Sequence, residues 1–221
     1  MLGWMILCSM LVNGAAAGLF YYELHNHREK YPARQGGKQP QAACLYSILM
    51  VIAAVGLSLF ITLFYSDNTF LFTLKRAVML AVLWPVAYTD FTAYRIPNLF
   101  VAAGLAARAA ILAAEFIWER DALLYGLLTE VAAAVVLFLV ALLCTVVVKN
   151  SIGGGDMKLF VVMGLLLGLQ GTWGAVFLSL IVSFIVAVAL LITRKKSRKD
   201  AIPFGPALAV GTYLSIFLTG M

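Results

Sequence analysis

Charged side chains are scarce in this sequence. Of its 221 residues, 12% are charged and 63% are hydrophobic. Soluble domains have roughly a quarter charged and about half apolar residues, so the composition excludes an ordinary soluble domain and indicates a membrane protein. The net charge of +6 comes from short basic runs between apolar segments. This distribution argues against the continuous basic face of a nucleic-acid-binding protein.

Cysteine is almost absent as well. The three cysteines, Cys8, Cys44 and Cys144, include no C-x-x-C pair, so neither a disulfide framework nor a zinc site is predicted. The first apolar run lacks a preceding basic stretch and a clear small-residue cleavage site. These absences favour a retained first helix over a cleaved signal peptide.

Long apolar runs dominate what remains. A membrane-spanning helix needs about 20 predominantly apolar residues, and this pattern predicts an all-α polytopic membrane protein with a single transmembrane domain over residues 1–221. We expect a bundle of about eight transmembrane helices, with six to eight compatible with the pattern. The expected segments are 1–22, 43–65, 69–89, 98–118, 122–148, 157–170, 173–193 and 202–220.

Basic residues gather on one side of this arrangement. If residue 1 faces outward, the inner loops are 23–42, 90–97, 149–156 and 194–201, and they hold most of the lysines and arginines. The positive-inside rule therefore predicts that these loops, including the dense basic loop at 194–201, face the cytoplasm. Lys75 and Arg76 disagree, because they fall inside the third segment. Either they snorkel outward or that segment begins later.

Asp90 stands near the end of the third segment. Pro97 restricts the residue before it to extended conformations, and Asn98 is the expected cap of the next helix. An acid at a helix C-terminus faces the negative end of the helix dipole, which opposes ionisation. The alternative is an ordinary acid at the membrane edge, paired with Arg95.

Asp156 follows the only run of three glycines, Gly153 to Gly155. Glycine allows unusual backbone angles and close approach of other groups, and the dipole of the helix that opens here favours a carboxylate. No G-K-[S/T] follows, so a phosphate-binding loop is disfavoured. A helix cap after a flexible turn is the alternative reading.

The segment after Asp156 is short. Residues 157–170 would form about 21 Å of helix against a hydrocarbon core of about 30 Å. Unless the helix continues further, its cytoplasmic end must lie below the membrane surface or the bilayer must thin. An ionisable group at that depth indicates a functional site.

The predicted topology places both acids at the same membrane face, although they are 66 positions apart in the sequence. Two adjacent carboxylates cannot both ionise readily, so they would share a proton and polarise a water molecule for attack on a peptide carbonyl. The helix-end argument gives the hypothesis that Asp156 is ionised while Asp90 holds the proton. Coupled titration leaves that assignment open.

Three motifs then resemble a known family. D-x5-I-P-N begins at Asp90, G-x-G-D-x-K begins at Gly153, and P-F-G-P-x-L-A-x-G runs from Pro203 to Gly211. These are similar to the motifs of the prepilin peptidases, which are GxGD-type intramembrane aspartic proteases. The resemblance implies that Asp90 and Asp156 are the catalytic pair of a type IV pilus or protein-secretion enzyme.

The resemblance also implies a substrate and a location. The substrate would be a prepilin-like or archaellin-like precursor with a hydrophobic N-terminal helix. Its short basic leader would be cut, typically just after a glycine, at the cytoplasmic face of the plasma membrane. No metal and no organic cofactor are implied. The residues expected to support the pair or bind substrate are Gly153, Gly155, Lys158, Pro97, Pro203, Gly205 and Pro206.

One feature departs from the family pattern. Many bacterial members carry a zinc-binding tetracysteine region after the first helix, associated with N-methylation of the trimmed pilin. Loop 23–42 contains no cysteine. We therefore expect peptidase activity without methyltransferase activity.

Other readings of the same residues stay open. A small membrane transporter or channel could use Asp90 and Asp156 as an ion or proton site, although the sequence shows no inverted repeat. An inactive scaffold in a secretion assembly is the third class. Lys158 could stabilise the Asp156 carboxylate or only snorkel at the interface. Arg108 and Glu130 lie at similar depth in neighbouring segments, which predicts a structural ion pair.

Overall fold

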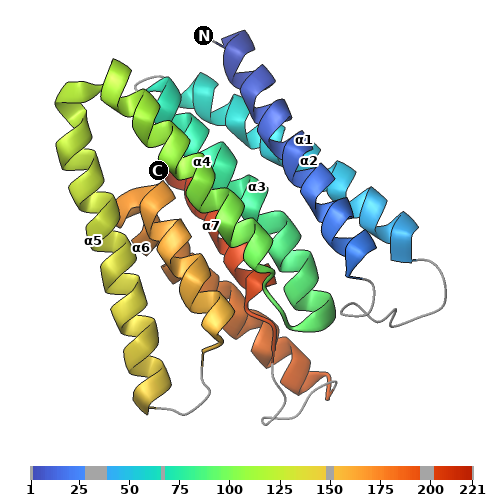
Figure 1. The fold of residues 1–221 in the computed structure, drawn as a ribbon. Coiled ribbons are helices and arrows are strands. Elements are labelled where there is room, and N and C mark those ends of the chain that lie inside the picture. The colour runs from blue at the N-terminus through green and yellow to red at the C-terminus, as the bar shows by residue number, and fades with distance from the viewer. Residues whose placement is uncertain (1, 28–38, 66–67, 148–151, 195–201, 221) are drawn as a thin grey trace.

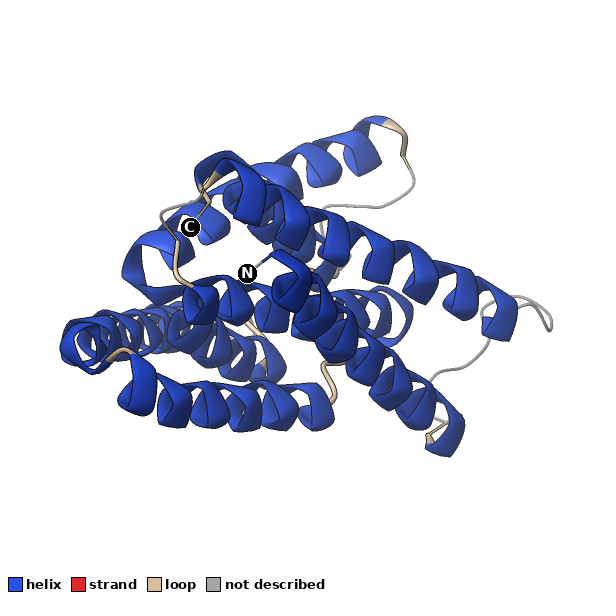
Figure 2. Ribbon diagram, turned by 90° about the horizontal axis from the view of Figure 1, so that it is seen from above, coloured by secondary structure: helices blue, strands red, loops and turns tan. Residues whose placement is uncertain are grey.

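The computed structural model describes residues 2–27, 39–65, 68–147, 152–194 and 202–220. Every regular element in these ranges is an α-helix (Figures 1 and 2). In chain order the helices are α1 (Leu2–Asn26), α2 (Gln39–Phe64), α3 (Phe70–Ala93), α4 (Asn98–Trp118), α5 (Arg120–Val147), α6 (Gly154–Ile192) and α7 (Gly205–Thr219). The expected loop 23–42 is shorter than predicted, because α1 and α2 extend into both of its ends. Its middle, and residues 195–201 of the basic loop, lie outside the described residues.

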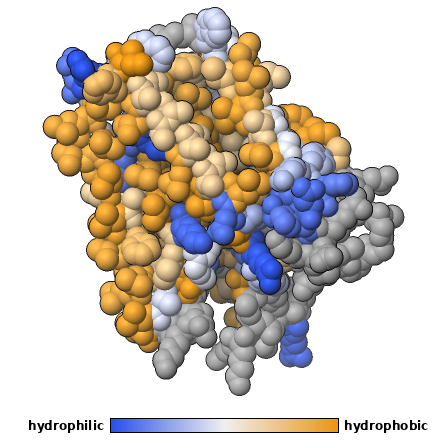
Figure 3. Space-filling model, viewed as in Figure 1, coloured by the Kyte–Doolittle hydropathy of each residue, from blue (hydrophilic) through white to orange (hydrophobic). Residues whose placement is uncertain are grey.

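The surface of the bundle is that of a membrane protein. Six helices are long and apolar enough to cross a bilayer, and α7 is a shorter apolar helix. Large apolar side chains such as Leu143 and Phe177 are mostly exposed, and apolar residues cover much of the face seen in Figure 3. Apolar exposure on this scale marks contact with lipid rather than water. The prediction of an all-α polytopic membrane protein is confirmed.

Helix α3 is the core of the bundle. It packs against α1, α2, α4, α6 and α7, and nearly every residue from Lys75 to Ala87 is buried. A helix that is apolar all round belongs in an interior rather than on a surface. The position of Asp90, in the last turn of α3, is therefore fixed from several sides.

The sixth and seventh expected segments are two helical arms, together labelled α6, that are separated by a sharp break at Gly168. At Gly168 the backbone has φ 68° and ψ −177°, a conformation open essentially to glycine alone. The predicted boundary at residues 171–172 is therefore wrong by a few residues. Unbroken, 39 residues would span about 58 Å, roughly twice the hydrocarbon core.

The two arms of α6 run in opposite directions, as Figure 1 shows. The first arm lies antiparallel to α5, with Gly164 against Ala134 and Gly168 beside Glu130. The second arm lies antiparallel to α7, with Gly174 beside Ser215 and Ser179 beside Gly211. The chain therefore leaves the end of the bundle that contains Asp156 and returns to that same end.

Buried charges join α3, α4 and α5. The Nζ atom of Lys75 lies 2.8 Å from a Glu115 carboxylate oxygen and 2.6 Å from one of Glu130. Arg108 pairs with the same two glutamates. The predicted pair between Arg108 and Glu130 is confirmed. The expectation that Lys75 snorkels outward is wrong, as is a later start for α3, because two carboxylates from other helices hold Lys75 in the interior.

Two arginines close the first arm of α6. Arg108 donates to the carbonyl oxygen of Leu165 at 3.0 Å, and Arg76 donates to those of Leu166 and Leu167 at 3.4 and 3.3 Å. Carbonyls at the end of a helix have no intrahelical donor and need another partner. The sequence suggested a surface position for Arg76. Arg76 is instead buried, and it binds the carbonyl groups that precede the break at Gly168.

Close packing at Gly164 gives a first test of the fold. An added methyl group there would overlap the backbone of Ala133 and Ala134, so Gly164→Ala must separate α5 from α6. We expect it to lower the free energy of unfolding by about 1–3 kcal/mol, measured as a lower Tm in detergent. Gly126→Ala is the matched control, because a methyl group there meets nothing. An unchanged Tm for Gly164→Ala would contradict the described packing.

Candidate active site

Asp90 is held at the C-terminal end of α3. The helix stops at Tyr94, whose backbone is left-handed with φ 53°, and Pro97 then serves as the N-cap of α4. The side chain of Asp90 is only 8% exposed. Arg95 is exposed, and no ion pair joins it to Asp90 in the described part of the chain. The reading of Asp90 as a paired acid at the membrane edge is therefore wrong.

The beginning of α7 supplies hydrogen bonds to Asp90. The backbone N–H of Gly205 donates to Oδ2 of Asp90 at 2.7 Å, and the backbone of Phe204 forms a second hydrogen bond with the same carboxyl group. A Cβ atom at Gly205 would come within 2.9 Å of Oδ2, so only glycine allows this approach. A helix N-terminus is a favourable partner for a carboxylate.

Asp156 lies in the first turn of α6. Its carboxylate forms a hydrogen bond with the backbone of Gly153, the N-cap of the helix. This is the return half of a capping box, in which the third helical residue satisfies the N–H of the cap. The expected helix opening at the glycine run is thus present, with Gly154 as the first helical residue.

The three motifs converge at this end of the bundle. A Cβ atom at Gly155 would lie 3.0 Å from that of Ile96, so this glycine lets α6 approach the turn before α4. Nζ of Lys158 donates to Oδ1 of Asn98 at 3.1 Å, which ties the same two segments together. Asp90 and Asp156 lie close enough that their carboxyl groups interact electrostatically.

Both acids therefore sit at a helix N-terminus, Asp90 at that of α7 and Asp156 at that of its own helix. The local sequence around Asp90 reveals only the C-terminus of α3, whose dipole opposes ionisation. The partner from α7 reduces the asymmetry on which the hypothesis of a protonated Asp90 rested. That hypothesis stays a prediction, with less support than the sequence alone gave it.

The other predicted residues either contact the two acids and the turn beside them or lie next to this site. Gly153, Gly155 and Gly205 lie against the two acids or the turn beside them. Lys158 is exposed and contacts Asn98. Asn98 itself is not the predicted cap, since Pro97 takes that position. Pro203 and Pro206 lie on either side of Gly205 and line an adjacent hollow.

Sequence reasoning missed two residues of the site, Ile96 and Phe204. Ile96 packs on Gly155, and Phe204 contributes its backbone to Asp90. Their positions inside two of the motifs were the available signal. Among the described residues, no group of three or more His, Cys, Asp or Glu side chains could hold a metal ion.

Comparisons with known proteins agree with the motifs. A family model described as the type IV leader peptidase family matches residues 77–192, more than half of the chain. A prepilin leader peptidase/N-methyltransferase of Bacillus subtilis (strain 168) is 31% identical over 173 residues, which cover 78% of this chain and 61% of the relative. A protein of the same name from Aeromonas salmonicida (strain A449) is 34% identical over 68 residues, or 31% of this chain and 23% of the relative.

The chain thus spans less than two thirds of the length of these curated relatives. No solved structure gives a significant match. The matched region of the family model contains Asp90 and Asp156, together with the turn at Ile96 and the glycine run, whereas α7 lies beyond it.

Proposed function

Because the chain belongs to the type IV leader peptidase family, we propose that it is a membrane aspartic endopeptidase that removes the leader of prepilin-like precursors. The observation that carries this proposal is the meeting of Asp90 and Asp156. They come from segments 66 positions apart, which pack together at one end of the bundle through Gly155 against Ile96 and Lys158 against Asn98. Archaellin-like precursors are a second form of the same substrate class.

The pair can divide the chemistry of peptide hydrolysis. Two adjacent carboxyl groups share one proton, because like charges at short range cannot both ionise readily. The ionised member takes a proton from water as the oxygen attacks the carbonyl carbon, and the protonated member donates to the carbonyl oxygen. As the C–N bond breaks, a proton passes to the leaving nitrogen. The products are a free carboxyl group and a free amine.

The charge pattern supports an active site that faces the cytoplasm, in the plasma membrane. Of the exposed lysines and arginines in the described ranges, Arg95, Lys158 and Arg194 lie in or beside the expected inner loops and Arg120 lies on the other side, an excess that the positive-inside rule associates with cytoplasmic segments. A short basic leader would remain on that side while the apolar helix of the precursor stays in the bilayer. The bond to be cut would then lie at the membrane face that holds the two acids.

We propose peptidase activity without methyl transfer. The names of the relatives include N-methyltransferase, but the tetracysteine region associated with that activity in the family has no counterpart in loop 23–42, which lacks cysteine. The test is to supply a methyl donor with the trimmed product. An unchanged product mass would support the proposal, and a gain of one methyl group would contradict it.

A cleavage assay in liposomes tests the main proposal. The purified chain is reconstituted with a precursor made of a short basic leader, a glycine and an apolar helix of about 20 residues. We expect two products separated after the glycine, identified by mass spectrometry. The same liposomes report proton or cation flux. Flux with an intact precursor would favour the transporter reading and contradict the peptidase.

A further inference from the structure

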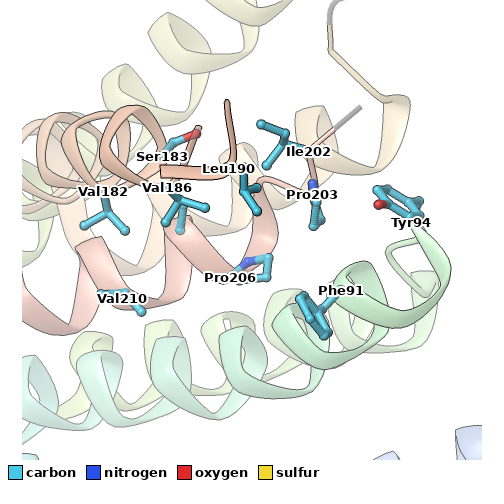
Figure 4. Close-up of a pocket in the computed structure, with 11 residues that line it drawn as sticks. Phe91, Tyr94, Val182, Ser183, Val186, Leu190, Ile202, Pro203, Pro206 and Val210 are labelled. Carbon is cyan, nitrogen blue, oxygen red and sulfur yellow. The ribbon is translucent and has the colours of Figure 1, made fainter. Parts of the chain in front are cut away.

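An apolar hollow opens beside Asp90, between the second arm of α6 and the beginning of α7. We call it the α6–α7 groove, and Figure 4 shows the side chains that line it. It has a volume of about 420 Å³. Its lining residues are Phe91, Tyr94, Val182, Ser183, Val186, Leu190, Ile202, Pro203, Pro206, Ala207 and Val210.

The groove runs along the helices rather than across them. Val182, Val186 and Leu190 follow one another at four-residue intervals on α6, and Pro206 and Val210 do the same on α7. Residues four apart share one face of a helix. The lining thus extends over about two helical turns, roughly 12 Å, from the end of the bundle that holds the two acids toward the interior of the bilayer.

One end of the groove reaches the proposed catalytic pair. Phe91 follows Asp90 directly and is 62% exposed, and Figure 4 shows its ring turned toward Pro206. Pro203 and Pro206 flank Gly205, whose backbone N–H binds Asp90. A chain seated in the groove would therefore contact Phe91, the neighbour of Asp90 in the sequence, and the two prolines that flank Gly205.

The shape of the groove limits what it can hold. Its volume of about 420 Å³ matches that of a few large apolar side chains. The groove can therefore take the side chains on one face of a helix, but not a whole helix. Recognition by shape is effective here, because apolar side chains gain nothing from leaving lipid and associate through close packing.

We infer that the α6–α7 groove receives one face of the first two turns of the apolar helix of the precursor. This inference rests on the proposed function and adds the position at which the substrate binds. The parts of the substrate and of the enzyme follow one another in the same order. The basic leader would lie in the cytoplasm, the bond to be cut at the two acids, and the apolar helix in the groove. Lipid chains could fill the same hollow, but the continuity with Asp90 favours the substrate.

A change of preference between two precursors tests this placement. Both carry the same leader and cleavage site, but the first two turns of the apolar helix contain leucines in one and alanines in the other. Val186→Trp fills the groove, so we expect it to shift the ratio of kcat/KM toward the alanine precursor by about tenfold or more, a change of about 1.4 kcal/mol in relative binding. A ratio does not depend on how much of the variant folds.

The matched control is Val188→Trp, which places the same side chain on the same helix outside the groove. We expect it to leave the ratio at the wild-type value. A ratio that is the same in Val186→Trp and wild type would overturn the placement while the peptidase proposal stands. If the wild-type chain cuts neither precursor, the peptidase proposal itself fails.

Photo-crosslinking gives a second measurement that does not need turnover. A photoreactive residue replaces Val210 in a variant that also carries Asp156→Asn. It should capture the leucine precursor at its first two apolar turns. The same residue at Val188 should capture mainly lipid. Equal capture of precursor from both positions, or capture of lipid alone from Val210, would overturn the placement even if Val186→Trp fails to accumulate.

Discussion

Replacing either Asp90 or Asp156 with asparagine is expected to slow leader cleavage by about a thousandfold or more. Asparagine has the shape of aspartate but cannot take a proton from water or share one with its partner, and positioned acid–base groups contribute about 10²- to 10⁴-fold. The fold should survive, because an amide oxygen at position 90 can still accept from the N–H of Gly205. The measurement is the single-turnover rate of precursor cleavage in liposomes.

The effects of the two substitutions on the cleavage rate should not add. Residues that act as a unit lose most of their contribution when either one is removed, so the double variant should be about as slow as each single variant. Asp121→Asn is the matched control, because Asp121 is an exposed acid in the first turn of α5, away from the candidate site. If either single variant keeps more than about a tenth of the wild-type rate, these acids do not form the catalytic pair.

Glu130→Gln is expected to cause the largest loss of stability. Its carboxylate accepts from both Lys75 and Arg108, and all three side chains are almost fully buried. In Glu130→Gln, the buried cations Lys75 and Arg108 share only Glu115, so one positive charge stays buried without compensation, and breaking a buried ion pair in this way costs about 3–5 kcal/mol. For a chain of this size that corresponds to a fall in Tm on the order of 10 °C, measured in detergent by intrinsic fluorescence.

Glu119→Gln provides the comparison for this experiment. Glu119 is only partly buried and forms the C-cap of α4 through its backbone, so its substitution should change the free energy of unfolding by less than about 1 kcal/mol. A Glu130→Gln variant as stable as the wild type would show that the network does not hold α3, α4 and α5 together.

Hydropathy predicted the helices well because every span that crosses lipid must be predominantly apolar. The apolar runs predict nearly all of the helical segments, and the loop charges alone predict that the two acids lie at one end of the bundle. The break in α6 was misplaced, since Gly168 lies within an uninterrupted apolar run and its backbone angles leave no trace in hydropathy. A glycine is only permissive, and the surrounding packing decides whether it turns.

The misread residues share one cause, which is that their partners come from other segments. Lys75 looked like an outward-reaching cation because neither Glu115 nor Glu130 could be assigned to it from the sequence. Asn98 looked like a helix cap, but Pro97 takes that position and the side chain of Asn98 accepts from Lys158, 60 positions later. Likewise, the hydrogen bonds from α7 to Asp90 depend on a contact across 115 positions, which local patterns cannot reveal.

The arginine contacts at the end of the first arm of α6 bear on how the protein is made. That arm ends at Gly168, beside the buried Glu130, and the carbonyls of Leu165, Leu166 and Leu167 accept from Arg76 and Arg108. Backbone groups left without partners in lipid cost several kcal/mol each, so the arm is unstable on its own. Both arginines precede it in the chain and emerge from the ribosome first. Biogenesis can therefore proceed in the direction of synthesis, with α3 and α4 already inserted to receive the end of the arm.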